Sequence, residues 1–249
     1  MKTTNIAAGA AALAAVGLLG AGLSGCSGSV KVETKSTPSV SAADLQKDLS
    51  DRLSSAGMTV KSVTCKDDLV GEVGKTAGCD VDFNDTNSVE AVFTATKVEG
   101  TTVSFDIAPA MTKDQLQKAV SSISNSPTVT CDSGVEGKVG AQTKCEVTKD
   151  GAASKRIAEV SQVDAPRLGL EISVWQVLSK QQLQDLLTQK MAADNGAPPE
   201  TVDCVDDVVA KKGTVVECSV SSGGQVQAYD VTVTDTQGDT VSFDYAAKP

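Results

Sequence analysis

Histidine is absent from the 249-residue sequence, and this absence excludes more chemistry than any other feature of the composition. Histidine is the commonest metal ligand, and it is the only side chain whose unperturbed pKa lies near neutral pH. A histidine-ligated metal, a Ser-His-Asp triad and a Cys-His dyad are therefore excluded. A hydrolase built on this chain would have to rely on carboxylates.

Basic and aromatic side chains are also scarce. The sequence has 22 Lys and Arg residues against 32 Asp and Glu, a formal net charge of -10, and only 3% of its residues are aromatic. Proteins that bind nucleic acids contact the phosphates with clustered Lys and Arg, so we expect no nucleic-acid partner. With so few aromatic residues, the core must consist mainly of Val, Leu, Ile and Ala.

Recognisable catalytic motifs are missing as well. No serine lies in a G-x-S-x-G context. The tripeptide Gly74-Lys75-Thr76 is not the end of a phosphate-binding loop, because Leu69 stands where that loop requires a glycine. We therefore expect that the protein is not an enzyme, with no catalytic residue and no cofactor.

Acidic residues gather just after three of the cysteines: Asp67-Asp68, Asp132 and Asp206-Asp207. Clustered carboxylates can hold calcium or act as an acid and base pair. No alternation of Asp or Asn with Gly and a distal Glu accompanies them, however, and turn capping by Asp is the favoured interpretation. We expect no metal site.

The N-terminus has the pattern of a lipoprotein signal. Lys2 precedes an uncharged apolar run from about Ile6 to Leu23, and Leu23-Ser24-Gly25-Cys26 resembles the lipobox of bacterial lipoproteins. The resemblance implies cleavage before Cys26, so that residues 1-25 are a signal peptide, and attachment of a diacylglycerol to the Cys26 thiol. Two or more acyl chains would anchor the protein stably in the membrane. The alternative is an ordinary signal peptide with a coincidental cysteine.

After this signal, residues 26-41 lack helical or alternating periodicity and are rich in Ser, Thr, Val and Lys. They are expected to form a flexible tether. No second apolar stretch approaches 18 residues, so we expect the rest of the chain to be soluble, on the extracytoplasmic face of the cell membrane.

The remaining cysteines repeat with a fixed spacing. They form three pairs, each fourteen positions apart: Cys65 and Cys79, Cys131 and Cys145, and Cys204 and Cys218. A spacing that recurs three times indicates an internal repeat. We predict three copies, over residues 42-109, 110-176 and 177-249.

Each copy starts with a helix signal. A hydroxyl residue stands three positions before an acidic or amide residue in Ser41 to Asp44, Thr112 to Gln115 and Ser179 to Gln182, which is typical of a helix N-cap. Apolar residues then follow at helical spacing: Leu45, Leu49 and Leu53; Leu116, Val120 and Ile123; Leu183, Leu187 and Met191. Gly57, Asn125 and Asn195-Gly196 are expected to end these helices.

Strand patterns follow each helix. Alternating apolar residues, such as Val103, Phe105 and Ile107, indicate half-buried strands, with turn residues between them. We predict an α+β fold of three tandem repeats, each with one helix packed on a four-stranded antiparallel sheet. The only tryptophan, Trp175, falls at the second junction, where it either packs between repeats or forms part of a binding site.

The cysteines of each pair share a sheet face with neighbouring apolar residues, because residues two apart in a strand point the same way. Cys65 follows Val63 by two positions and Cys79 precedes Val81 by two. Both sulfurs should therefore face the helix, where they can form an internal disulfide in an extracytoplasmic compartment. Zinc is the weaker alternative, because the spacing fits no common zinc site.

These features together resemble a domain of unknown function that is common in secreted lipoproteins of actinobacteria. The segments that carry the resemblance run from Cys65 to Cys79, from Cys131 to Cys145 and from Cys204 to Cys218, each with a Gly/Val loop. The resemblance implies a small α+β fold and an envelope location, but no activity. More loosely, the architecture is similar to secreted inhibitors of β-lactamases, although fold alone does not carry function.

The function expected from the sequence is non-enzymatic. We predict a membrane-anchored cell-envelope lipoprotein that acts as a binding or scaffold module for an envelope protein partner. One alternative is a carrier of a lipid or other apolar ligand, which would need a junction cleft of several hundred cubic ångströms. The other is an inhibitor of a secreted enzyme.

Overall fold

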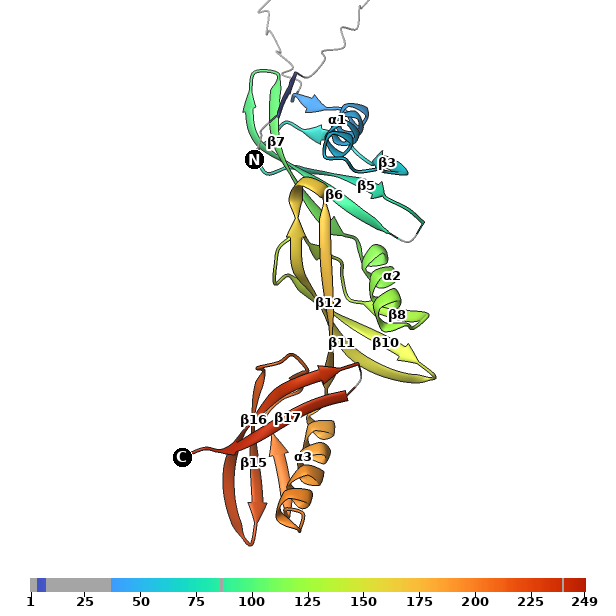
Figure 1. Cartoon of the computed structure of the whole chain (residues 1–249). Coiled ribbons are helices and arrows are strands. Elements are labelled where there is room, and N and C mark those ends of the chain that lie inside the picture. The colour runs from blue at the N-terminus through green and yellow to red at the C-terminus, as the bar shows by residue number, and fades with distance from the viewer. Residues whose placement is uncertain (1–3, 8–36, 86, 239) are drawn as a thin grey trace, which may run out of the picture. The chain divides into compact units, whose positions relative to one another are not determined.

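The computed structural model describes residues 4–7, 37–85, 87–238 and 240–249. The described residues, whose helices and strands are drawn in Figure 1, form two compact units. Unit 1 runs to Asn84 and resumes over Glu90–Ala108, and unit 2 comprises Asp85–Val89 and Pro109–Pro249. The predicted lipidation site Cys26, most of the predicted signal peptide and most of the predicted tether lie outside the described residues.

Unit 1 contains one helix and a sheet with the strand order β1-β7-β6-β5-β3, beside a separate β2-β4 pair. The pairings β1 with β7, β3 with β5 and β2 with β4 are antiparallel. The elements that begin in this part of the chain are β1 (Thr4–Ala7), β2 (Ser39–Val40), α1 (Ala42–Ser55), β3 (Ser62–Cys65), β4 (Leu69–Val70), β5 (Thr76–Asp82), β6 (Ser88–Glu99) and β7 (Thr102–Met111).

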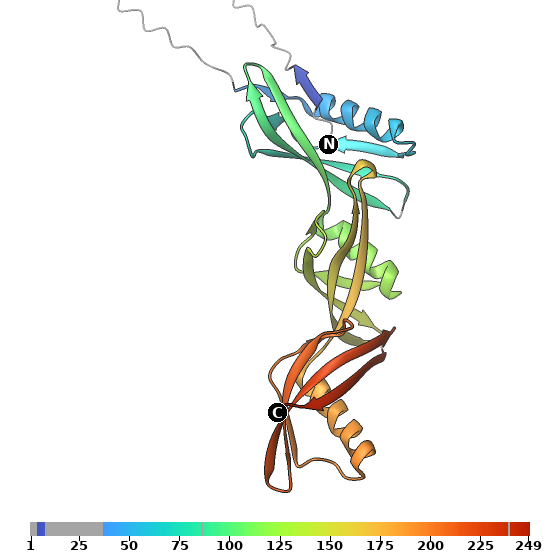
Figure 2. The same ribbon diagram turned by 60° about the vertical axis from the view of Figure 1, so that its left-hand side comes forward.

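Unit 2 contains two helices and two sheets, with the strand orders β14-β12-β11-β10-β8 and β13-β15-β16-β17. Its elements are α2 (Lys113–Ser124), β8 (Thr128–Cys131), β9 (Val135–Glu136), β10 (Gln142–Lys149), β11 (Ala152–Asp164), the 3-10 helix η1 (Ala165–Arg167), β12 (Gly169–Leu178), α3 (Lys180–Asn195), β13 (Thr201–Cys204), β14 (Val208–Val209), β15 (Val215–Ser222), β16 (Gln225–Gln237) and β17 (Thr240–Ala247). Both units have the predicted α+β character. Each helix packs against the first strand that follows it, as Figure 2 shows for the ribbon.

The helices begin and end where the sequence predicts. Ser41, Thr112 and Ser179 are the N-caps, and the last two form complete capping boxes with Gln115 and Gln182. At the other ends, three residues adopt the left-handed conformation that closes a helix: Gly57, Asn125 and Gly196. None of the helices in the described residues is long and apolar enough to span a bilayer.

The predicted apolar stripes form the cores, with one exception. Leu45, Leu49 and Leu53 of α1 are buried, and so are Leu183, Leu187 and Met191 of α3. In α2, Leu116 and Val120 are buried but Ile123 is 53% exposed. The prediction for Ile123 was wrong because it lies in the last turn of α2, and α2 has 12 residues where α1 has 14 and α3 has 16.

A strand of two residues follows the first cysteine of each pair and adds to the four strands that the sequence predicts. These short strands pair with an earlier part of the chain: β4 with β2, β9 with the end of β7 at Ala110 and Met111, and β14 with the end of β12. Their first residues are buried: Leu69, Val135 and Val208. The prediction of a flexible tether over residues 26-41 is therefore wrong at its end. Ser39 and Val40 form β2, which pairs with β4, and Val40 is buried.

The turn after each short strand closes with the same hydrogen bonds. Gly74, Gly140 and Gly213 have φ values of 88°, 86° and 89°, and their backbone N–H groups donate to Ala95, Val160 and Val233 at 2.8, 2.9 and 2.8 Å. Positive φ suits glycine, which has no Cβ to clash. The tripeptide at Gly74 thus forms a structural turn rather than a phosphate loop.

Two ion pairs connect the halves of unit 2. Lys211, which follows β14, places its Nζ 2.8 and 2.9 Å from the carboxylate oxygens of Glu159 on β11. Lys155 Nζ lies 3.3 Å from Asp207. With the pairing of β12 and β14, these contacts explain why the predicted second and third copies belong to one compact unit.

The different burial of Leu116 and Ile123 can be tested with alanine. Leu116→Ala should lower the free energy of unfolding by about 2–5 kcal/mol, because it removes a fully buried side chain. Ile123→Ala should change it by less than about 0.5 kcal/mol. Urea denaturation of both variants measures the difference, and equal losses would contradict the exposed position of Ile123.

Candidate functional site

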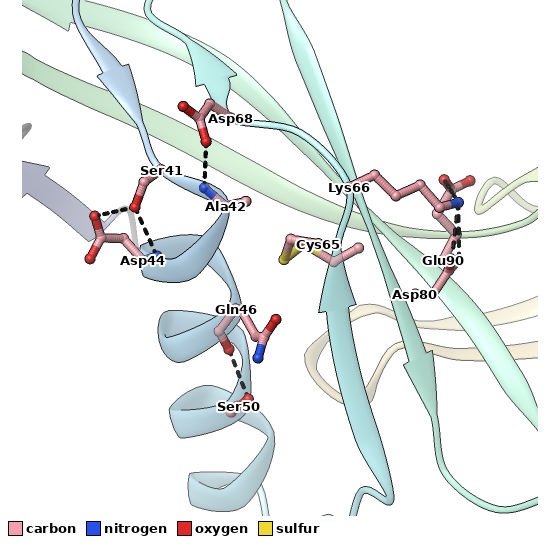
Figure 3. The surroundings of a disulfide bond; sticks show 11 residues. Ser41, Ala42, Asp44, Gln46, Ser50, Cys65, Lys66, Asp68, Asp80 and Glu90 are labelled. Atoms are coloured by element: carbon pink, nitrogen blue, oxygen red, sulfur yellow. Dashed lines mark hydrogen bonds and ion pairs between the residues drawn. A yellow bond between two sulfur atoms is a disulfide. The ribbon is translucent and has the colours of Figure 1, made fainter.

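The cysteines form the three predicted disulfides. Cys65 bonds to Cys79, Cys131 to Cys145 and Cys204 to Cys218, and in each case the two residues are directly opposite on neighbouring strands. Figure 3 shows the first bond beside α1. All six described cysteines are therefore bonded and none is available as a thiol nucleophile.

The acidic loops after the first cysteines hold the starts of two helices. Asp68 accepts a hydrogen bond of 2.8 Å from the backbone N–H of Ala42, the first residue of α1 (Figure 3). Asp207 accepts one of 2.9 Å from Lys180, the first residue of α3. Since helix N-termini have unsatisfied N–H groups and a partial positive charge, both carboxylates stabilise their helices.

The middle loop has no carboxylate at the corresponding position. Gly134 occupies the position of Asp68 and Asp207, and a Cβ added there would lie 2.1 Å from Met111 O and 3.0 Å from Lys113 N. Only glycine permits so close an approach to the start of α2. Asp68 and Asp207 therefore cap helices, whereas the sequence predicted that they cap turns.

The remaining charges near these loops form surface pairs. Lys66 lies 3.1 Å from Asp80 and 3.9 Å from Glu90, and the hydrogen bond to Asp80 is the main reason that the pKa of Lys66 is raised. Across the described residues, no three His, Cys, Asp or Glu side chains are grouped so as to hold a metal ion.

A cleft of about 820 Å³ in unit 2 is the strongest candidate for a binding site. This volume is typical of a small-molecule site. Residues of α2, β10, β11, β12, β16, the loop after β14 and the turns after β10 and β16 line it: Ile123, Ser124, Val147, Lys149, Asp150, Ala152, Ser154, Arg156, Val174, Trp175, Gln176, Ala210, Thr236 and Gly238.

Strand register places the polar floor of the cleft in the row of the second disulfide. Cys131 is opposite Cys145, Cys145 is opposite Arg156, and Arg156 is opposite Gln176. Side chains at opposite positions of antiparallel strands point to the same face. Arg156 and Gln176 therefore lie on the face of the sheet that α2 covers.

The end of α2 leaves part of that face open. The last turn of α2 supplies Ile123 and Ser124 to the cleft, and the sheet supplies Val147 and Val174. Because α2 is the shortest of the three described helices, apolar side chains at this end of the sheet border a cleft instead of a helix. The cleft thus has an apolar lining beside its polar floor.

Two buried polar atoms of the cleft residues lack partners. Trp175 Nε1 and Gln176 Oε1 have no hydrogen-bond partner in the described part of the chain. Trp175 and Gln176 are consecutive residues of β12, so their side chains point to opposite faces of the sheet, and both atoms are buried from solvent. Lys211 Nζ, which pairs with Glu159, lies 5.7 Å from the centre of the Trp175 ring.

The sequence drew attention to one residue of this site. Trp175 was predicted to serve either packing or binding, and it lines the cleft. Ile123 was assigned to a core, and Lys149, Arg156 and Gln176 were not singled out. Their roles depend on the pairing of β10, β11 and β12, which strand periodicity alone does not specify.

Comparison with known proteins identifies a recurring domain. A family model described as a domain of unknown function (DUF4333) matches residues 21–100 and 168–238, together more than half of the chain. The first region contains the Cys65–Cys79 bond and the second the Cys204–Cys218 bond. No curated protein and no protein of solved structure matches the chain.

The capping role of Asp207 predicts a pH dependence. The hydrogen bond from Lys180, aided by Lys155, lowers the pKa of Asp207 below its ordinary value of 3.8. A lowered pKa in the folded state stabilises the fold above about pH 4, and this contribution is lost as the pH falls through the folded pKa. Asp207→Asn should lower the free energy of unfolding at neutral pH by about 0.5–1 kcal/mol, a modest loss because the carboxylate is exposed.

Thermal unfolding between pH 7 and pH 2 measures this effect. The difference between wild type and Asp207→Asn should shrink toward the acid end. Asp206→Asn, which changes the neighbouring exposed carboxylate, is the matched control and should have no such effect. A stability difference that does not vary with pH would refute the capping role.

Proposed function

The chain belongs to the family of the domain of unknown function DUF4333. We propose that it is a non-enzymatic binding lipoprotein of the cell envelope. Its binding site is the cleft in unit 2. The protein is held at the extracytoplasmic face of the membrane by acyl groups on Cys26, as in secreted actinobacterial lipoproteins. Its cargo is a small molecule with an apolar part.

Two features of the chain support the envelope location. The uncharged apolar run before Cys26 and the lipobox-like Leu23-Ser24-Gly25 sequence fit a cleaved signal. Three disulfides in one chain fit an oxidising compartment, since thiols are kept reduced in the cytosol. If residues 1-25 are removed, β1 is removed with them, and the edge of β7 at Thr102–Phe105 loses its partner strand.

Residues 42-109, 110-176 and 177-249 are three copies of one module, each a helix on a four-stranded antiparallel sheet with an internal disulfide. The shared N-caps, the fourteen-residue cysteine spacing and the matching turns at Gly74, Gly140 and Gly213 support this arrangement. The middle copy differs by its shorter helix and by Gly134. Most residues that line the cleft belong to this divergent copy.

The observation that carries the binding function is the cleft in unit 2. A scaffold for a protein partner, or an inhibitor of a secreted enzyme, needs no such hollow. A carrier needs one, and 820 Å³ suits a molecule of modest size. The cleft therefore favours the carrier among the binding functions open to this chain.

Lipidation can be tested by metabolic labelling. Cells that express the full chain and receive an alkyne analogue of palmitate should incorporate the label into the protein. Cys26→Ala removes the acceptor thiol and should abolish labelling, and the uncleaved chain should accumulate. Label retained on Cys26→Ala, or no label on the wild type, would contradict the membrane anchor.

Binding in the cleft can be followed through Trp175, because it is the only tryptophan in the sequence. Eight-carbon amphiphiles with anionic, neutral or cationic heads are added to the full chain in phosphatidylcholine vesicles. At least one of them should change the tryptophan emission, and the change should saturate. Ala152→Phe introduces a large side chain into the cleft lining and should weaken this response about 10-fold or more.

Ala153→Phe is the matched control for this titration. Ala153 is the next residue of β11, is also exposed, and points to the opposite face of the strand. It should leave the response unchanged. If eight-carbon amphiphiles with anionic, neutral and cationic heads all leave the emission of Trp175 unaltered, the proposed binding function fails.

A further inference from the structure

We propose that the disulfide between Cys65 and Cys79 is a site of thiol–disulfide exchange, and that it reacts preferentially with a thiol that carries a positive charge. This inference goes beyond the binding function proposed above and does not depend on it. The chain supplies its own comparison, because the same cross-link between neighbouring strands occurs in three places and differs among them in exposure.

Only the first bond has a cysteine that is open to solvent. Cys65 is partly exposed at the end of β3, whereas its partner Cys79 is fully buried. The cysteines of the two bonds in unit 2 are at most 4% exposed: Cys131, Cys145, Cys204 and Cys218. Exchange requires that a thiolate reach one of the two bonded sulfur atoms, so access decides which bond reacts. We therefore expect Cys65 to be the cysteine that is attacked.

A glutamine joins the helix to the strand beside the first cysteine in unit 2, but not in unit 1. The Gln117 side chain accepts a hydrogen bond of 3.0 Å from the backbone N–H of Cys131, and the Gln184 side chain donates one of 3.1 Å to Asp203. Both glutamines are half-buried. The counterpart in α1, Gln46, is exposed, and within the described residues its side chain makes no hydrogen bond to β3 (Figure 3). The first bond thus lacks the contact that accompanies the burial of the others.

Carboxylates outnumber cations at the exposed end of the first bond. Asp67 and Asp68 follow Cys65 within three positions. The adjacent cation, Lys66, is already paired with Asp80, whose carboxylate lies 3.1 Å from its Nζ. An incoming thiolate is itself an anion, so this surface repels it. An ammonium group on the attacking thiol offsets the repulsion, whereas a carboxylate adds to it.

The reaction takes two steps. In the first, the thiolate forms a bond to Cys65 Sγ while the bond to Cys79 breaks, and the electron pair leaves on Cys79 Sγ, which takes a proton from water. In the second, another thiolate attacks the external sulfur of the mixed disulfide and releases Cys65, which is protonated in turn. Two molecules of the thiol are oxidised to a disulfide, and the Cys65–Cys79 bond is reduced to two thiols.

Opening this bond acts on an edge strand. β3 is the last strand of the sheet in unit 1 and pairs with β5 over four residues, one of which is Cys65. The cross-link restricts the unfolded chain by closing a loop of about 15 residues. Exchange at Cys65 therefore lowers the stability of unit 1, while unit 2 keeps both of its disulfides.

The test treats the full chain in phosphatidylcholine vesicles with cysteamine, 2-mercaptoethanol or 3-mercaptopropionate at equal thiolate concentrations. Iodoacetamide traps the free thiols at successive times, and peptide mass spectrometry identifies the labelled cysteines. Cys65 and Cys79 should be labelled at least about 10-fold faster than the cysteines of unit 2, which are the internal controls.

The charge preference is read from the same three thiols. Each rate is divided by the rate of the same thiol with the neutral disulfide of 2-mercaptoethanol, which removes differences in intrinsic nucleophilicity. Cysteamine should then react fastest and 3-mercaptopropionate slowest. Salt at about 0.5 M should narrow the difference, because it screens exposed charges.

Two variants distinguish direct attack from opening by unfolding. Gln46→Phe places a large side chain at the position whose counterpart in α2 contacts Cys131, and it should slow the labelling of Cys65 and Cys79 about 10-fold. Ser54→Phe is the matched control, because Ser54 is also exposed on α1 but lies about 12 Å further along the helix. It should leave the rate unchanged. The comparison among the three wild-type bonds provides the test if Gln46→Phe does not fold.

Each remaining outcome would overturn part of the proposal. Equal labelling of all three bonds, or faster labelling in unit 2, would overturn the exchange site. Early labelling of Cys65 and Cys79 that Gln46→Phe does not slow would overturn direct attack on the exposed sulfur. A corrected rate with 3-mercaptopropionate that equals or exceeds the rate with cysteamine would overturn the preference for a cationic thiol.

Discussion

Each helix packs against a strand whose last residue is a cysteine, and that cysteine is bonded to the residue directly opposite on the next long strand. The bond holds the register of the two strands covalently. Because side chains alternate between the faces of a strand, a slip of one residue would turn residues such as Val63 and Val81 from the core to solvent. Closing a loop of about 15 residues also contributes roughly 3 kcal/mol on the chain-entropy account, a large share of the stability of a core that contains few aromatic side chains.

The same register connects the disulfide to the candidate site. In the second sheet the row that begins with Cys131 and Cys145 continues to Arg156 and Gln176, which line the cleft. In the third sheet the corresponding row continues from Cys204 and Cys218 to Tyr229 and Ala247. The same disulfide-linked arrangement of strands therefore presents Arg156 and Gln176 in the second sheet but Tyr229 and Ala247 in the third. The shorter α2 leaves the charged row accessible.

The parts of the fold that depend on local patterns were predictable, and the parts that depend on pairing were not. N-caps such as Thr112, helix ends such as Asn125 and the cysteine pairs are encoded within about fifteen residues of sequence, so the predictions agreed with the structure. Two-residue strands such as β9 are too short to show a period, and their existence depends on a distant strand. Ile123 continues the helical period of Leu116 and Val120, but the place where the sheet stops being covered by the helix is not a local property. The cleft was unpredictable for the same reason, although Trp175 pointed to its position.

Binding of a small molecule with an apolar part in the cleft of unit 2 is the central proposal, and the position of the molecule can be observed directly. Crystals of the full chain grown with an eight-carbon amphiphile that carries an ω-bromine would locate the bromine by its anomalous signal. We expect the bromine in the cleft, against Ile123, Val147 and Val174. A bromine peak elsewhere on the chain would contradict the proposed binding site.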